Sequence, residues 1–254
     1  MKKKTSTKEF KKRIGIILMV LALICGSGLF FLNSLGVIDI PLIPKASSDE
    51  QIKIACVGDS VTFGYGLRNR EETNYPSVLQ RMLGQDYLVE NFGVSGHCVQ
   101  ETSNQPYAYS NNYRMSLDYD ADIVVFMMGS NDTKVDNWQG IEHFRDSYCK
   151  LLDSYRDAKI VLCTPPTAFY INSLGEVTRD DSDGITSFEI QPRFVEEIAD
   201  MVYDVAREHS YPVVDINTIT DGNPQWFEVD GTHPNEDGTK AIAEAVHEKL
   251  ISLK

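Results

Sequence analysis

Residues 52–60 have the sequence IKIACVGDS, an almost unbroken apolar run that ends in Gly-Asp-Ser. Apolar side chains at consecutive positions are typical of a strand that is buried on both faces of a sheet. Four further runs of this kind follow along the chain, at 87–93, 122–129, 159–165 and 211–216. The sequence therefore predicts five short, buried strands.

Amphipathic stretches separate these runs. Their apolar residues recur with helical spacing, which predicts helices at 76–83, 141–155, 192–208 and 237–250. Strands that alternate with helices indicate an α/β fold with a doubly wound, mostly parallel five-stranded sheet of the flavodoxin-like kind, covered by helices on both faces. Ligands of such sheets bind beyond the carboxyl ends of the strands. The polar, acidic segment 167–190 shows neither pattern, and we expect a long loop that is functional or mobile.

Residues 1–50 differ in composition from the rest of the chain. Residues 14–32, IGIILMVLALICGSGLFFL, carry no charge and are long enough to cross a membrane as a helix. Segment 1–13 is rich in lysine and arginine, and the positive-inside rule predicts that such a segment stays in the cytoplasm. We therefore expect a single-pass signal anchor at 14–32, a linker at 33–50 and one extracytoplasmic domain at 51–254. A cleaved signal peptide, which would release a secreted domain, is the alternative.

The chain of 254 residues has a formal net charge of -13, and the part beyond the basic amino terminus is more acidic still. Such a surface repels polyanions, so nucleic acid is not an expected partner. The cysteines do not have metal-ligand spacing, and we expect neither a metal nor a cofactor. Cys56 and Cys163 lie in predicted strands and are expected in the core, while the pairing of the cysteines stays open.

Polar motifs follow the first and third predicted strands and precede the last predicted helix. They are Gly58-Asp59-Ser60, Gly129-Ser130-Asn131-Asp132 and Asp230-Gly231-Thr232-His233-Pro234-Asn235. Acyl transfer needs a hydroxyl nucleophile, a base that takes its proton, and a carboxylate that orients the base. It also needs hydrogen-bond donors for the oxyanion. A serine, an amide and an Asp-x-x-His sequence at one sheet edge could supply all of these groups.

These three motifs, in this order, resemble those of the SGNH hydrolase family, the GDSL-type lipases and esterases, and the resemblance spans about 51–254. It implies Ser60 as nucleophile, His233 as general base and Asp230 as the third member of the triad. It also implies an oxyanion hole formed by Ser60, Gly96 and Asn131. The resemblance places the oxyanion glycine in a block after the second predicted strand, where residues 91–96 have the sequence NFGVSG. Gly96 is the least defined of these residues, because the same stretch also contains Gly93.

Each of these residues also has a structural explanation when it is taken singly. Ser60 and Asp59 could cap a helix after the first strand, and only the set of motifs favours catalysis. Asp59 and Asp132 are expected to serve in caps and turns rather than in the triad. His97, next to the proposed oxyanion glycine, could line the pocket.

The predicted activity is hydrolysis of O-acyl esters of carbohydrates, with a small O-acetyl group favoured by the polar character of segment 167–190. Aromatic faces near the strand ends suit sugar rings, although core packing explains them equally well. A lysophospholipase or thioesterase, an acyltransferase with the same triad, and a non-catalytic carbohydrate-binding module stay open as alternatives. The aromatic residues in question are Tyr65, Tyr75, Tyr107, Tyr109, Tyr113, Trp138, Phe169, Tyr170, Trp226 and Phe227.

Overall fold

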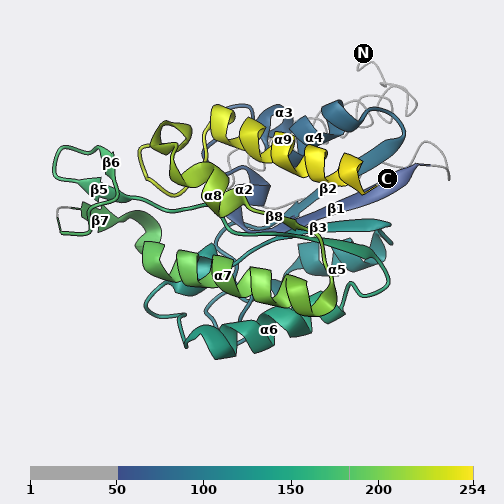
Figure 1. The fold of residues 1–254 in the computed structure, drawn as a ribbon, viewed down its shortest axis with the longest axis horizontal. Helices are drawn as coiled ribbons and strands as arrows, with labels where there is room; N and C mark the ends of the chain where they lie inside the picture. Colours follow the sequence, from purple (N-terminus) through teal and green to yellow (C-terminus); the bar gives the residue numbers. More distant parts are fainter. Residues whose placement is uncertain (1–50, 183, 254) are drawn as a thin grey trace, which may run out of the picture. The chain divides into compact units, whose positions relative to one another are not determined.

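Strand β1 (Ile52–Gly58) lies inside a five-stranded sheet in which all neighbouring strands are parallel. The computed structural model describes residues 51–182 and 184–253, so the predicted segment 1–13, anchor 14–32 and linker 33–50 lie outside the described residues. The strand order is β2 (Tyr87–Gly93), β1, β3 (Ile123–Met127), β4 (Lys159–Cys163) and β8 (Val213–Val214) (Figure 1). The predicted five-stranded parallel sheet is confirmed.

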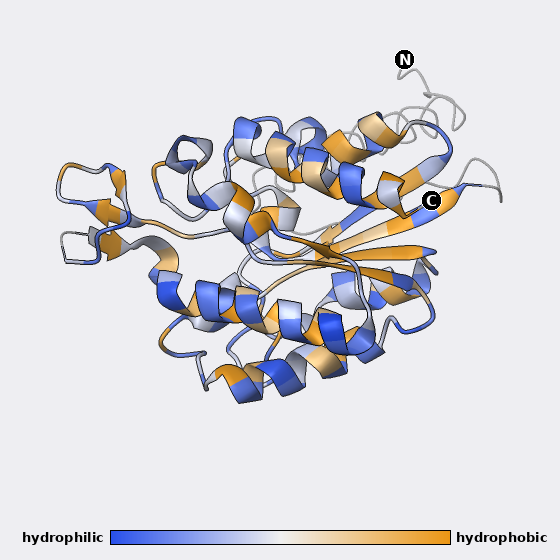
Figure 2. Ribbon diagram, viewed as in Figure 1, coloured by the Kyte–Doolittle hydropathy of each residue, from blue (hydrophilic) through white to orange (hydrophobic). Residues whose placement is uncertain are grey.

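The apolar runs are unbroken because the sheet has a core on each face. Along β1, Ala55 and Val57 pack into one core, whereas Ile54 and Cys56 pack into the other. All four side chains are fully buried. Figure 2 shows the strands as the most continuously apolar elements of the molecule, whereas the helices are of mixed hydropathy.

Helices cover both faces of the sheet, as the alternation of patterns predicts. Helices α5 (Asn111–Asp118), α6 (Ile141–Asp153) and α7 (Pro192–His209) pack on the face that includes Ala55. Helices α4 (Tyr75–Leu83) and α9 (Glu236–Ser252) pack on the opposite face (Figure 1). The sequence pattern does not predict α5, because its residues NNYRMSLD are largely polar.

Short elements connect the main ones. They are the helices α2 (Ser60–Phe63), α3 (Arg70–Thr73) and α8 (Ile216–Asp221), and the 3-10 turns η1 (Tyr107–Tyr109), η2 (Ser130–Thr133), η3 (Ser187–Glu189) and η4 (Pro224–Trp226). Within residues 51–182 and 184–253, none of the helices combines the length and the apolarity that a membrane span requires. The four cysteines of this part of the chain are free, and Cys56 and Cys163 are buried as predicted.

Segment 167–190, which we call the insert, is more ordered than the expected loop. It contains a small antiparallel sheet of β6 (Val177–Thr178), β5 (Tyr170–Asn172) and β7 (Gly184–Thr186), which stands apart from the main sheet (Figure 1). Strands of two or three residues are too short to show a period-2 pattern, which is why the sequence predicts a loop here. Asp183 lies outside the described residues.

Strand β8 is also shorter than the predicted 211–216. Its carboxyl end is set by Asp215, whose side chain accepts a hydrogen bond from the Thr218 N–H at 3.1 Å and thereby caps α8. The chain therefore turns into a helix directly after Val214. Only Val213 and Val214 pair with β4.

Candidate active site

A chain of hydrogen bonds joins the three residues of the predicted triad. Nε2 of His233 lies 3.0 Å from Oγ of Ser60, and Nδ1 lies 2.8 Å from Oδ2 of Asp230. The other Asp230 oxygen, Oδ1, accepts the backbone N–H groups of Thr232 at 2.8 Å and His233 at 2.9 Å. The carboxylate thus fixes both the ring and the backbone of His233, and Nδ1–H donation to Asp230 leaves Nε2 free to accept the Ser60 proton.

Asp230 is held in its ionised form. Burial by itself would raise the pKa of this carboxyl, but hydrogen bonds from the His233 ring and backbone and from the Thr232 N–H outweigh it and lower the pKa. An ionised carboxylate stabilises an imidazolium at His233 when the ring takes a proton. The pair is therefore suited to general-base chemistry.

Ser60 owes its position to the tight turn between β1 and α2. A Cβ on Gly58 would lie 1.9 Å from Oγ1 of Thr62, so only glycine fits where the strand meets the helix. Asp59 is the N-cap of α2, and its side chain accepts the Val61 N–H at 3.0 Å. Burial raises the pKa of Asp59 to about 6. Its capping contact agrees with the structural role predicted for it.

The predicted oxyanion residues line the same cleft as Ser60 and His233. Gly96 and Asn131 both belong to its wall, and Gly96 has a φ of +79°, which glycine adopts without strain. Gly93 does not line the cleft, because it packs on α2, where an added Cβ would lie 2.2 Å from the Phe63 nitrogen. The structure therefore favours Gly96 over Gly93 as the glycine of the cleft.

Hydrogen bonds link the segment that carries Asn131 to the loop that carries Gly96. Nδ2 of Asn131 donates to the His97 carbonyl at 3.2 Å, while the His97 side chain binds the Ser95 carbonyl and does not line the cleft. Asp132 is fully buried and accepts the N–H groups of Val99 and Gln100, each at 2.9 Å. Asp132 thus holds η2 against the loop that carries Gly96, and burial raises its pKa to about 7.

Two aromatic rings pack around His233. The ring centroids of Tyr65 and His233 are 4.5 Å apart, and those of Phe188 and His233 are 5.0 Å apart. Tyr65 and Phe188 also contact each other edge-to-face at 5.8 Å. Both rings line the cleft, which has a volume of about 200 Å³. They reduce the access of water to the imidazole and leave apolar faces for a ligand.

Among the ten aromatic residues considered in the sequence, Tyr65 alone lines the cleft. Tyr75 and Tyr107 are fully buried in the core, which fits the alternative explanation of core packing. Sequence reasoning missed Phe188, because it lies in the polar insert and no pattern marks it. Its backbone has φ 54° and ψ 18°, an uncommon left-handed conformation for a bulky residue.

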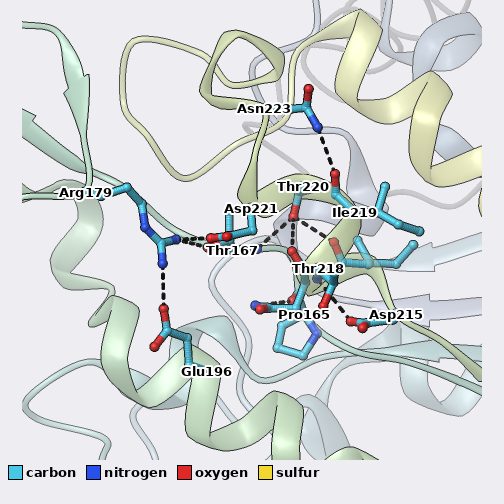
Figure 3. Close-up of polar contacts among 12 residues, drawn as sticks. Pro165, Thr167, Arg179, Glu196, Asp215, Thr218, Ile219, Thr220, Asp221 and Asn223 are labelled. Atoms are coloured by element: carbon cyan, nitrogen blue, oxygen red, sulfur yellow. Dashed lines mark hydrogen bonds and ion pairs between the residues drawn. The ribbon is translucent and has the colours of Figure 1, made fainter.

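Arg179 connects the insert to the body of the molecule. Its guanidinium donates to Oγ1 of Thr167 and to the carboxylate of Glu196 on α7, both at 2.9 Å, and it also pairs with Asp221 of α8 (Figure 3). Thr167 is fixed in turn, because its N–H donates to Oγ1 of Thr220 at 3.0 Å (Figure 3). The insert, and with it Phe188, is therefore held by side chains from two helices.

No metal site accompanies these residues in the part of the chain that the structure describes. Within it, no group of three or more His, Cys, Asp or Glu side chains is arranged to hold a metal ion.

Known proteins share both the sequence pattern and the fold. The chain matches the GDSL-like lipase/acylhydrolase family over residues 56–241. It is 29% identical over 223 residues to an acetylxylan esterase of Xylanibacter ruminicola, covering 79% of this chain but only 43% of that protein. It is 26% identical to an arylesterase of Vibrio mimicus, covering 82% of this chain and 92% of that protein.

Solved structures add support for the fold. The lipase/acylhydrolase of Enterococcus faecalis superposes with a TM-score of 0.63 at 22% identity, covering 80% of this chain and 97% of that one. At this identity, the likeness concerns the arrangement of strands and helices rather than the substrate.

Proposed function

Because the chain belongs to the GDSL-like lipase/acylhydrolase family, we propose that it is a carboxylic ester hydrolase with a Ser60–His233–Asp230 triad. The observation that carries this proposal is the hydrogen-bond path from Ser60 Oγ through the His233 ring to Asp230, at 3.0 Å and 2.8 Å. Ser60 and His233 line a cleft whose wall also includes Asn131 and Gly96.

In the proposed reaction, Ser60 Oγ attacks the ester carbonyl while Nε2 of His233 takes the hydroxyl proton. The oxyanion that forms is stabilised by Nδ2 of Asn131 and by the backbone N–H groups of Gly96 and Ser60. His233 then protonates the departing alcohol, which leaves an acyl-serine. A water molecule, deprotonated by His233, then attacks the acyl carbonyl. His233 returns this proton to Ser60 Oγ as the bond between Oγ and the acyl group breaks, which releases the acid. Asp230 stays ionised throughout and stabilises the imidazolium.

The test of this mechanism is the Ser60→Ala variant. Its ester hydrolysis should fall to background, with the melting temperature close to that of the wild type, because the change removes one hydroxyl at the wall of the cleft and water can replace its hydrogen bond to His233. A serine-directed fluorophosphonate should label the wild type and not the variant. Wild-type esterase activity in Ser60→Ala would show that another nucleophile operates, and absence of labelling would favour a non-catalytic binding module.

For the substrate, we propose O-acetyl esters of carbohydrates. The acetylxylan esterase of Xylanibacter ruminicola supports this choice, as does a cleft of about 200 Å³ whose aromatic walls can contact a sugar ring. Acetate release from acetylated xylan is the direct measurement. Rates on p-nitrophenyl acetate and p-nitrophenyl palmitate test the acyl length, and a preference for the palmitate would favour a lipid substrate instead.

We also propose that the domain acts outside the cytoplasm, anchored through residues 14–32. The support is the uncharged run of this segment and the basic residues that precede it. Protease added to intact cells should then digest the domain and leave the anchor in the membrane fraction. Full protection of the domain from protease would contradict this placement.

A further inference from the structure

The wall of the cleft includes a basic residue besides His233, Lys134, and the proposed ester hydrolysis does not use it. This lysine directly follows η2, which carries Asn131, and it lines the cleft together with Ser60 and His233. Its backbone is fixed, since the Lys134 carbonyl accepts the N–H groups of Asn137 at 2.9 Å and Trp138 at 2.8 Å. The ammonium group is therefore attached to a rigid part of the site.

Lys134 forms no ion pair in the described part of the chain, and the carboxyl on which its charge acts, Asp59, is buried and only partly ionised near its raised pKa of about 6. Lys53, Lys150 and Lys240 each form an ion pair with a carboxylate, but no carboxylate among residues 51–182 and 184–253 pairs with Lys134. The chain has 37 acidic residues, yet neither Asp nor Glu lines the cleft. An unpaired cation in an otherwise acidic molecule is thus placed where the substrate binds.

The surroundings of Lys134 strengthen its interaction with an anion. The cleft wall includes the apolar side chains of Val61, Phe188 and Ile190, and apolar walls weaken the screening of charge by water. An ammonium has three donors and no acceptor, so a carboxylate oxygen is a better partner for it than a neutral hydroxyl. A substrate that carries a carboxylate near the ester would supply the missing partner.

We propose that Lys134 forms an anion subsite of the cleft, and that the preferred esters carry a carboxylate that pairs with its ammonium group. This inference rests on the proposed ester hydrolysis, whose site it extends. The carboxylate can belong to the alcohol, as in an acetylated uronic acid, or to the acyl group, as in a hemisuccinate. Both give the same charge-assisted contact with Lys134.

The kinetic test uses two pairs of esters that differ by one carboxylate. Acetylated glucuronic acid is compared with acetylated glucose, and p-nitrophenyl hemisuccinate with p-nitrophenyl butyrate. We expect wild-type kcat/KM to favour the charged member of one pair, which identifies the source of the carboxylate. Lys134→Gln should lower this preference about tenfold, mainly through KM, because the contact already exists in the bound substrate. Added salt should also lower it.

Lys240→Gln is the matched control, because Lys240 is exposed on α9 and lies outside the cleft wall. It should leave the preference unchanged. The subsite is overturned if wild type favours neither charged ester, or if Lys134→Gln keeps the preference. Equal losses on charged and neutral esters would also overturn it, since they indicate a role in oxyanion stabilisation.

A binding measurement separates this inference from the proposed activity. Calorimetric titration of purified Ser60→Ala with glucuronate, succinate and glucose needs no turnover. Tighter binding of one anion than of glucose, lost when Lys134→Gln is added to Ser60→Ala, supports the subsite even if the ester assays fail. Equal binding of all three in both variants refutes it independently of catalysis.

Discussion

Asn131 is the residue whose substitution reports most directly on the oxyanion hole. One amide hydrogen of Asn131 is used on the His97 carbonyl at 3.2 Å, which orients the group within the cleft wall. We expect Asn131→Ala to lower kcat by about 10²-fold or more, because the lost hydrogen bond forms to charge that develops in the transition state. KM for p-nitrophenyl acetate should change little.

Steady-state kinetics on this ester check the effect of Asn131→Ala, with Asn111→Ala at the exposed start of α5 as control. A loss confined to KM would argue against a donor role for Asn131. Circular dichroism should show that both variants are folded.

The residues of the candidate triad could be predicted because each lies in a short motif next to a strand or helix. Two other features of the site could not. The choice between Gly93 and Gly96 depends on which glycine packs under α2, and the sequence does not show that contact. The amides that Asp132 binds, at Val99 and Gln100, lie 33 and 32 residues earlier in the chain.

At the scale of elements, the apolar runs and helical patterns predict the main sheet and four of its covering helices, but not the insert. The strands of the insert have two or three residues, and contacts with distant elements hold it in place. Arg179 supplies polar contacts of this kind through Glu196 of α7 and Asp221 of α8 (Figure 3). Such tertiary support leaves no periodic signal in the sequence.

Loss of Arg179 should therefore loosen the insert and the Phe188 ring that packs on His233. We expect Arg179→Met to lower kcat/KM roughly 3- to 10-fold and to speed proteolytic cleavage within 172–187, because ordering the insert then costs conformational entropy on binding. Limited proteolysis and kinetics measure the two effects. The control is Arg207→Met, which removes an exposed ion pair with Asp204 on α7. Unchanged proteolysis of Arg179→Met would mean that the apolar contacts of the insert suffice.

The whole molecule combines a net charge of -13 with buried carboxyl groups that resist ionisation. Burial raises the pKa of Asp59 to about 6, of Asp132 to about 7 and of Glu90 to about 8. Unfolding returns each to an ordinary value of about 4. At a pH between the unfolded pKa of about 4 and the raised folded pKa, each of these carboxyl groups keeps its proton in the folded state but has released it in the unfolded chain. The free energy of unfolding should therefore fall as pH rises from about 4 to about 8. Asp230, whose pKa is lowered, acts in the opposite sense and loses its contribution as pH falls below about 4.

Glu90 offers the sharpest test of this pH dependence, because it lies on β2, away from the cleft, and is only 7% exposed. In Glu90→Gln the side chain keeps its size and an acceptor oxygen but can no longer ionise. Urea unfolding should give nearly equal stabilities for variant and wild type near pH 4, where Glu90 of the wild type is largely protonated in both the folded and the unfolded state. Near pH 8 the variant should be more stable by roughly 4 kcal/mol, since only the wild type then carries the cost of a buried charge or a retained proton. Glu244→Gln, on the surface of α9, should show no such divergence. A stability difference between Glu90→Gln and wild type that stays constant from pH 4 to pH 8 would mean that Glu90 ionises in the folded protein as readily as in the unfolded chain.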